Sequence, residues 1–106
     1  MSVDCAMVLT TFPADGDADA FARTLVGERL AACVSVLPLM QSTYRWKGIV
    51  ENAAERQVVI KTTAANVTAV TRRLQELHPY EVPEVLVVNM DEGSRAYLRW
   101  LNDSVS

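Results

Sequence analysis

Residues 33–62 read CVSVLPLMQSTYRWKGIVENAAERQVVIKT, and this stretch determines the architecture of the chain. Its two halves have the apolar and β-branched composition of strands, and Lys47-Gly48 between them predicts a hairpin turn. Pro38 interrupts the first strand, and because proline lacks a backbone donor we expect a bend or bulge there. The two strands together span roughly 30 residues, whereas a typical strand has about five or six. The sequence therefore predicts one unusually long hairpin.

Shorter elements flank this hairpin on both sides, and hydrophobic periodicity identifies each of them. The expected elements are a central strand covered on both faces over 5–12, a helix over 18–29 capped by Asp15 or Asp17, extended residues 32–46, a returning strand that ends at 62, a helix over 67–77, a buried strand over 85–88 and a short final helix that begins at Gly93 or Ser94. The order βαββαβ plus a C-terminal helix predicts an α+β fold, the ferredoxin-like split βαβ sandwich, with both main helices on one face of an antiparallel sheet. We expect a single domain over 1–106.

Composition excludes several classes of function. The 106 residues carry a formal net charge of −3, so we expect no nucleic-acid partner, which would need clustered Lys and Arg. No apolar run approaches the roughly 20 residues that span a bilayer, and residues 1–5 lack the basic start of a secretion signal. Cys5 and Cys33 fit reduced thiols better than a disulfide framework. We therefore expect a cytoplasmic protein without a membrane partner.

The long hairpin also predicts an oligomer. Tyr44, Trp46, Ile49 and Val50 lie near its tip, where a two-layer core of this size cannot cover them. A long, exposed apolar edge is an aggregation hazard unless another chain pairs with it. We therefore expect a closed homo-oligomer.

Residues 78–83, HPYEVP, contain the only histidine of the chain. Each proline favours extended backbone just before it, so the segment is a stiff bend that carries an imidazole, a phenol and a carboxylate. One interpretation is a helix stop followed by a turn, with His78 beside the end of the helix dipole. The other is a set of binding groups on a rigid loop. These six residues alone favour the first interpretation.

Five motifs stand in order along most of the chain: ERLAACV at 28–34, YRWKG at 44–48, IKT at 60–62, HPYEVP at 78–83 and YLRWL at 97–101. Each is weak alone, but together they make the chain similar to the CutA family of divalent-cation-tolerance proteins. The resemblance implies a ferredoxin-like homotrimer with a PII-like architecture, in which the long hairpins cross between subunits. It also implies a link to copper and other divalent ions. Ser35 departs from the family, where asparagine is common, and residues 39–41 lack the frequent glycine.

Cys33, His78 and Glu81 are the candidate metal ligands. A closed transition-metal site needs about four ligands, and this chain has two cysteines, one histidine and no C-x-x-C or H-x-x-x-H spacing. A trimer would supply three copies of each ligand at the subunit boundaries. Cys33 matches the Ala-Ala-Cys motif of the family and suits Cu(I) or zinc, although it is also explained as a small apolar residue of a buried strand. We expect copper or another divalent cation and no organic cofactor.

Lys61, Tyr44, Trp46 and Tyr80 are the candidate residues of a ligand cleft. Lys61 ends the third strand and His78 ends the next helix, so we expect both at the same end of the sheet. If the hairpins cross between subunits, Tyr44 and Trp46 of one chain would wall a cleft floored by Lys61 of another. Such a cleft suits a small anion or metabolite, with Lys61 supplying positive charge. The alternatives are interface packing for the aromatic residues and a solvated strand end for Lys61.

Motifs of catalysis are absent from the sequence, which has no G-x-S-x-G, no glycine-rich phosphate loop and four glycines in all. We therefore assign no catalytic residue and predict a CutA-like protein that binds copper or other divalent metal ions in metal tolerance and homeostasis. The alternative is a PII-like trimeric signalling module that binds a small metabolite between subunits. A third hypothesis is an enzyme at a cleft formed by His78 and Lys61.

Overall fold

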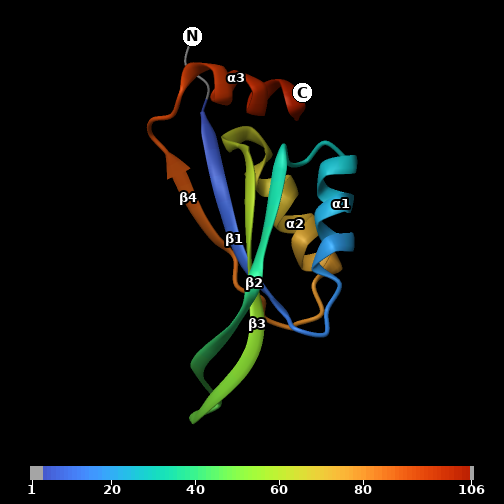
Figure 1. Ribbon diagram of the computed structural model, residues 1–106, viewed down its shortest axis with the longest axis vertical. Coiled ribbons are helices and arrows are strands. Elements are labelled where there is room, and N and C mark those ends of the chain that lie inside the picture. The colour runs from blue at the N-terminus through green and yellow to red at the C-terminus, as the bar shows by residue number, and fades with distance from the viewer. Residues whose placement is uncertain (1–3, 106) are drawn as a thin grey trace.

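The predicted order of strands and helices is present in the computed structural model, which describes residues 4–105 (Figure 1). The elements are β1 (Cys5–Pro13), α1 (Ala18–Gly27), β2 (Cys33–Trp46), β3 (Ile49–Thr63), the short 3-10 helix η1 (Ala64–Asn66), α2 (Val67–Leu77), β4 (Leu86–Met90) and α3 (Arg95–Ser104). The antiparallel sheet has the strand order β2-β3-β1-β4. This is the split βαβ order, so the predicted ferredoxin-like fold class is confirmed. The expectation about a secretion signal concerns residues 1–5, of which 1–3 lie outside the described chain.

The hydrophobic core lies between the sheet and the pair α1 and α2, which lie on the same face of it (Figure 1). Alternate residues of β1 and β3 point to this side because side chains alternate across a strand. The buried core residues are Val8, Phe12, Ala18, Phe21, Leu25, Ala31, Val58, Ile60, Val70 and Leu74. Helix α1 begins after Asp17, whose side chain accepts a 2.9 Å hydrogen bond from the backbone N–H of Ala20. Of the two expected caps, Asp17 is therefore the one used.

The motif at 28–34 holds the corner between α1 and β2. Arg73 of α2 donates two hydrogen bonds to Glu28, from Nε to Oε1 at 2.9 Å and from Nη2 to Oε2 at 2.8 Å. These bonds lower the pKa of the Glu28 carboxyl. Arg29 then turns the chain with a left-handed φ of 61°, and the Leu30 carbonyl accepts a hydrogen bond from the Thr62 hydroxyl at 2.6 Å. These contacts give the motif a structural role.

Helix α3 covers only one end of the opposite side of the sheet. Leu101 is fully buried there against Cys5 and Ala32, and Ser94 caps the helix by accepting a hydrogen bond from the Tyr97 N–H at 3.2 Å. The expected final helix is confirmed, and it runs from Arg95 to Ser104 after the Ser94 cap.

The remainder of that side, which we call the open face, is formed by Met7, Leu9, Val59, Leu86 and Val88. None of them belongs to the clusters that pack against the helices, and Leu86 and Val88 are 54% and 40% exposed. An apolar sheet face of this kind is a surface that normally contacts another chain.

Two expectations about burial are wrong for the single chain. The strand predicted over 85–88 is β4, an exposed edge strand rather than a buried one, because it pairs only with β1. The strand predicted over 5–12 is central, but only one of its faces is fully covered, because α1 and α2 both pack on the same side. Strands β1 and β4 are therefore both apolar, but the chain itself does not cover both faces of either strand.

The β2–β3 hairpin projects well beyond the rest of the sheet (Figure 1). Its pairing register shifts between Val36 and Leu39, so the expected irregularity at Pro38 is confirmed. Lys47 and Gly48 have φ values of 51° and 81°, and positive φ at both central residues defines a type I′ turn. The projection makes the molecule 48 × 25 × 23 Å and raises its radius of gyration to 14.5 Å. A compact chain of this length has about 13 Å.

Candidate functional site

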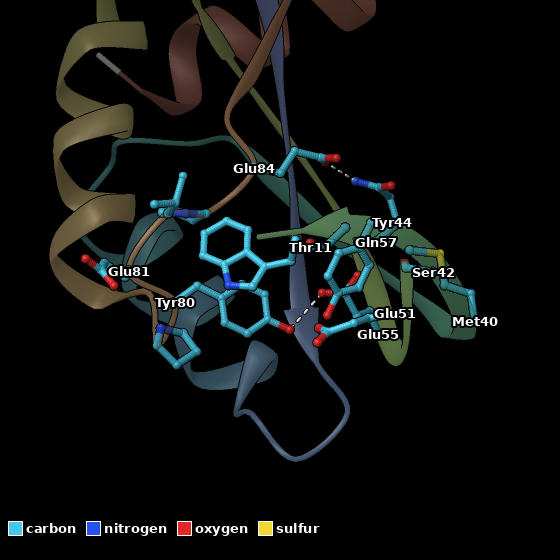
Figure 2. A pocket seen from close by; sticks show the side chains of 14 residues that line it. Thr11, Met40, Ser42, Tyr44, Glu51, Glu55, Gln57, Tyr80, Glu81 and Glu84 are labelled. Carbon is cyan, nitrogen blue, oxygen red and sulfur yellow. Dashed lines mark hydrogen bonds between the residues drawn. The ribbon is translucent and has the colours of Figure 1, made fainter. Parts of the chain in front are cut away.

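A cleft of about 780 Å³ lies on the open side of the sheet, between the arm of the hairpin and the loop that follows α2 (Figure 2). Strand pairing sets one wall, because Tyr44 lies opposite Glu51 and Met40 lies opposite Glu55 in β2 and β3. Loop residues 79–84 form the other wall. A volume of this size suits a metabolite.

His78 holds the loop against the sheet. Pro79 excludes helical geometry just before it, so α2 ends and His78 is extended at φ −78° and ψ 137°. The ring Nε2 donates to the Thr11 carbonyl at 2.6 Å, and Nδ1 accepts from the Tyr80 N–H at 3.0 Å. The carbonyl can only accept and the amide can only donate, so the tautomer is fixed as neutral Nε2–H. The ring also packs on Phe12, with centroids 4.4 Å apart.

Burial keeps this imidazole neutral. His78 is 8% exposed, and desolvation lowers its pKa from the ordinary 6.5, which the hydrogen bond to Thr11 and the charge of Glu55 oppose in part. Both ring nitrogens already carry hydrogen bonds, so neither offers a free lone pair to a metal ion in this conformation. The observed contacts therefore favour the interpretation of His78 as a structural residue at the end of a helix.

Tyr80 connects the two walls of the cleft. Its hydroxyl donates to Glu55 Oε2 at 2.7 Å, and Figure 2 shows the phenol reaching across toward that carboxylate. Burial first, and then the hydrogen bond and charge of Glu55, raise the pKa of Tyr80 strongly. Burial together with Glu51 and Glu55 also raises the pKa of Tyr44. Both phenols are therefore neutral hydrogen-bond donors at physiological pH.

Acidic and aromatic residues make up half of the 14 residues that line the cleft. Glu51, Glu55, Glu81 and Glu84 belong to the lining, in which residues 4–105 of the chain place no Lys, Arg or His. Glu84 accepts a hydrogen bond from Gln57 Nε2 at 2.9 Å. Glu81 points away from the other carboxylates (Figure 2). The cleft therefore carries net negative charge.

Tyr44, Trp46 and Tyr80 all line this cleft, as does Glu81. Lys61 does not, because it lies at the other end of the sheet. Its ammonium is 3.4 Å from the Tyr97 hydroxyl and 5.7 Å from the centre of that ring.

The expectation that Lys61 and His78 share one end of the sheet is not met within the chain. Lys61 pairs with Met7, whereas His78 binds Thr11, four positions further along β1 and about 13 Å away. The physical reason is that α2 starts where β3 ends and runs back along the sheet, so its last residue returns to the opposite end. An enzymatic pair of Lys61 and His78 would have to come from different chains.

Cys33, His78 and Glu81 are likewise not assembled by one chain. Cys33 is half-buried and pairs with Lys61 in the sheet, with its sulfur 3.8 Å from the Ser35 hydroxyl. Among residues 4–105 there is no group of three or more His, Cys, Asp or Glu side chains placed to hold a metal ion.

The sequence interpretation missed Glu51, Glu55 and Glu84 as cleft residues. A two-residue turn at 47–48 fixes the register of the hairpin and so places Glu51 opposite Tyr44, which is a usable sequence pattern. Glu55 is displaced by the irregularity near Pro38, and Glu84 is brought in by a loop, so no local periodicity marks either of them.

The fold and the cleft define a ferredoxin-like α+β protein with a cavity of metabolite size on one side of its sheet. The chain belongs to the CutA family, because residues 6–104 match the family described as CutA1 divalent ion tolerance protein.

Relatives agree with this assignment over nearly the whole chain. The divalent-cation tolerance protein CutA of Thermus thermophilus is 42% identical, and the match covers 92% of this chain and 95% of that protein. The crystal structure of CutA from Xylella fastidiosa superimposes with a TM-score of 0.92 at 43% identity, covering 96% of this chain and 98% of that one. CutA1 from Oryza sativa superimposes with a TM-score of 0.94 at 34% identity, covering 99% and 96%.

Proposed function

We propose that this protein acts in divalent-cation tolerance as a homotrimer that binds metal ions, copper among them, rather than as an enzyme. Membership of the family supports the link to divalent cations, and a relative at 42% identity is named divalent-cation tolerance protein CutA. Within residues 4–105 of one chain no ligand set for a metal is gathered, so a metal site would need side chains from more than one subunit. An oligomer is therefore part of the proposal.

The open face is the observation that supports assembly. It leaves Leu86 and Val88 half-exposed, and the hairpin adds Leu39, Ile49 and Val50, which are 54%, 62% and 58% exposed. Apolar area of this extent is worth roughly 25 cal/mol per Å² when it is removed from water. Trimerisation with crossing hairpins would cover these surfaces and unite ligands from different chains.

Cys33 is the preferred metal ligand of the proposed set. Its thiol is partly accessible, whereas Cys5 is buried at 2% exposure, and a thiolate suits Cu(I) or zinc. Glu81 is exposed on the loop and would join from a neighbouring subunit. His78 would join only by giving up its hydrogen bond from the Tyr80 N–H.

A copper titration of wild type and two matched cysteine variants tests the metal proposal. We expect Cys33→Ser to weaken copper binding at least tenfold and Cys5→Ser, which removes an enclosed thiol, to leave it within twofold. A smaller loss of copper affinity in His78→Gln would identify the imidazole as a secondary ligand. Equal affinity and stoichiometry in wild type and Cys33→Ser would contradict the role of Cys33.

The cleft favours a second function, a PII-like module that binds a small metabolite. Its volume of about 780 Å³ and its aromatic residues Tyr44, Trp46 and Tyr80 support this candidate. Lys61 would reach such a cleft only from another subunit. Thermal stabilisation by members of a metabolite panel is the expected result, and no stabilisation by any of them would remove this candidate.

We also propose a cytoplasmic location with neither a nucleic-acid nor a membrane partner. Both thiols are free in the described chain, which fits a reducing compartment. No helix between residues 4 and 105 has the length and apolarity needed to cross a bilayer. Fractionation of the source cells with an antibody to the chain tests the location.

A further inference from the structure

We propose that the cleft selects an organic cation, an amine or quaternary ammonium compound with an apolar portion, rather than a small anion, which was one of the two ligand classes that the sequence suggested. This inference rests on the second proposed function, a cleft that binds a small molecule. The juxtaposition that carries it is a buried carboxylate, further carboxylates and three aromatic side chains on the walls of one cavity, with no basic residue in the lining.

Glu55 is a buried carboxylate on the wall of the cleft. The residue is 7% exposed, and its Oε2 accepts the Tyr80 hydroxyl, but no cationic side chain pairs with it. The ion pairs between residues 4 and 105 all involve Arg73, which lies on α2 outside the lining. A buried charge is expensive unless a partner of opposite sign accompanies it. A bound cation would provide that partner.

Two neighbouring carboxylates, like Glu55, lie beside neutral groups rather than beside a cation. Glu84 accepts a hydrogen bond from the Gln57 amide, and Glu51 lies opposite Tyr44 in the hairpin, so the groups beside both carboxylates are neutral. Neutral donors fix the position of a carboxylate without cancelling its charge. The arrangement therefore keeps negative potential inside the cleft, and an anion would be repelled from it.

Geometry favours an organic cation over a bare metal ion. The carboxylates do not converge, since no three acidic, Cys or His side chains in the described part of the chain are placed around one point. The walls between them are the rings of Tyr44, Trp46 and Tyr80, which attract ammonium groups through their π faces and bury apolar carbon.

Trp46 also provides the readout for a test on the full-length assembled protein. The chain has two tryptophans, and Trp100 lies on α3 beside Tyr97, at the other end of the sheet. In a Trp100→Phe background the fluorescence of Trp46 reports on the cleft alone. The probes are choline, spermidine, malate and 3,3-dimethyl-1-butanol, which is the neutral isostere of choline.

We expect saturable fluorescence changes with choline or spermidine, and binding of dimethylbutanol at least tenfold weaker than that of choline. Glu55→Gln, which retains an acceptor for Tyr80, should weaken cation binding at least tenfold. Glu92→Gln removes the same charge from an exposed residue outside the cleft and should change it less than twofold. Glu51→Gln is the second variant if Glu55→Gln fails to fold.

The remaining outcomes distinguish the preference for a cation from the existence of a small-molecule site in the cleft. Saturable binding of malate or dimethylbutanol without the cations would overturn the cation inference and leave the ligand cleft standing. Cation affinity that is unchanged in both Glu55→Gln and Glu51→Gln would overturn the assignment to these carboxylates. Failure of all four probes to bind, in a protein with native circular dichroism, would contradict the cleft itself as a small-molecule site.

Discussion

Among individual residues, His78 has the greatest influence on the site. One neutral ring donates a hydrogen bond to the Thr11 carbonyl of β1, accepts one from the N–H of Tyr80 and packs against Phe12 with tilted ring planes. Protonation would occur at Nδ1, which would then present a second N–H to the Tyr80 amide in place of an acceptor. The loop that walls the cleft therefore depends on the uncharged state of this imidazole.

The stability of the protein should consequently fall in mild acid. The pKa of His78 is lowered in the folded chain, so below the ordinary value of 6.5 the unfolded chain binds a proton that the folded chain does not. This contribution to the free energy of unfolding is fully present above pH 6.5 and is lost as the pH falls toward the lowered folded pKa. Urea unfolding at fixed protein concentration, at pH 7.5 and pH 5.5, measures the loss.

The control for this prediction is His78→Gln, which removes the only histidine. At pH 7.5 the variant should lose about 1–3 kcal/mol per chain, the usual effect of leaving buried hydrogen-bonding groups without partners. Between pH 7.5 and 5.5 its stability should change less than that of wild type. A wild-type protein whose pH dependence matches that of the variant would show that His78 does not titrate in this range.

Among the secondary-structure elements, the hairpin of β2 and β3 was the most predictable from local sequence, whereas the residues that surround it in space were the least predictable. The turn at Lys47-Gly48, the irregularity at Pro38 and the great length of β2 and β3 all follow from local sequence. Local residues encode turn chemistry and strand composition directly. Both main helices were predictable for the same reason, since their apolar spacing needs no knowledge of neighbours.

The cleft was predictable only in part. Tyr44, Trp46 and Tyr80 were identified through motif resemblance, and they line one cavity. The predicted position of Lys61 beside His78 was wrong, because α2 runs back along the sheet and places His78 at the opposite end from Lys61. Glu84 was missed because the path of an irregular loop depends on tertiary contacts, and residue spacing carries no trace of them.

Two glycine substitutions test the turn of the hairpin. Gly48 has a φ of +81° and Gly27 in α1 does not have a positive φ, while an added Cβ would meet nothing within 4 Å at either position. Gly48→Ala should lower stability by about 1 kcal/mol because L-residues disfavour the left-handed region. Gly27→Ala should raise stability by up to about 1 kcal/mol through helix propensity. Thermal unfolding of both variants at equal concentration gives the comparison, and an equal effect of the same sign would contradict the type I′ turn.

At the scale of the whole molecule, the two sides of the sheet differ in how far the chain covers them. One side of the sheet is sealed by α1 and α2, while the open face and the hairpin arm leave apolar side chains in water (Figure 1). Edge strand β4 adds unpaired backbone groups next to that face. These exposed surfaces are where we expect a second chain to bind.

Assembly can be tested with two surface valines of equal exposure. Val88 lies on the open face and is 40% exposed, and Val26 on α1 is 42% exposed. A buried carboxylate at an apolar interface is costly, whereas one on an exposed helix is not. We expect Val88→Asp to dissociate the oligomer and Val26→Asp to leave its mass unchanged.

Light scattering of the wild-type protein in dilute buffer, beside these two variants, is the decisive measurement. We predict a mass of three 11.7 kDa chains for wild type and Val26→Asp, and a smaller mass for Val88→Asp. A wild-type mass of one chain, with native circular dichroism at micromolar concentration, would contradict the assembled binding protein proposed for this sequence.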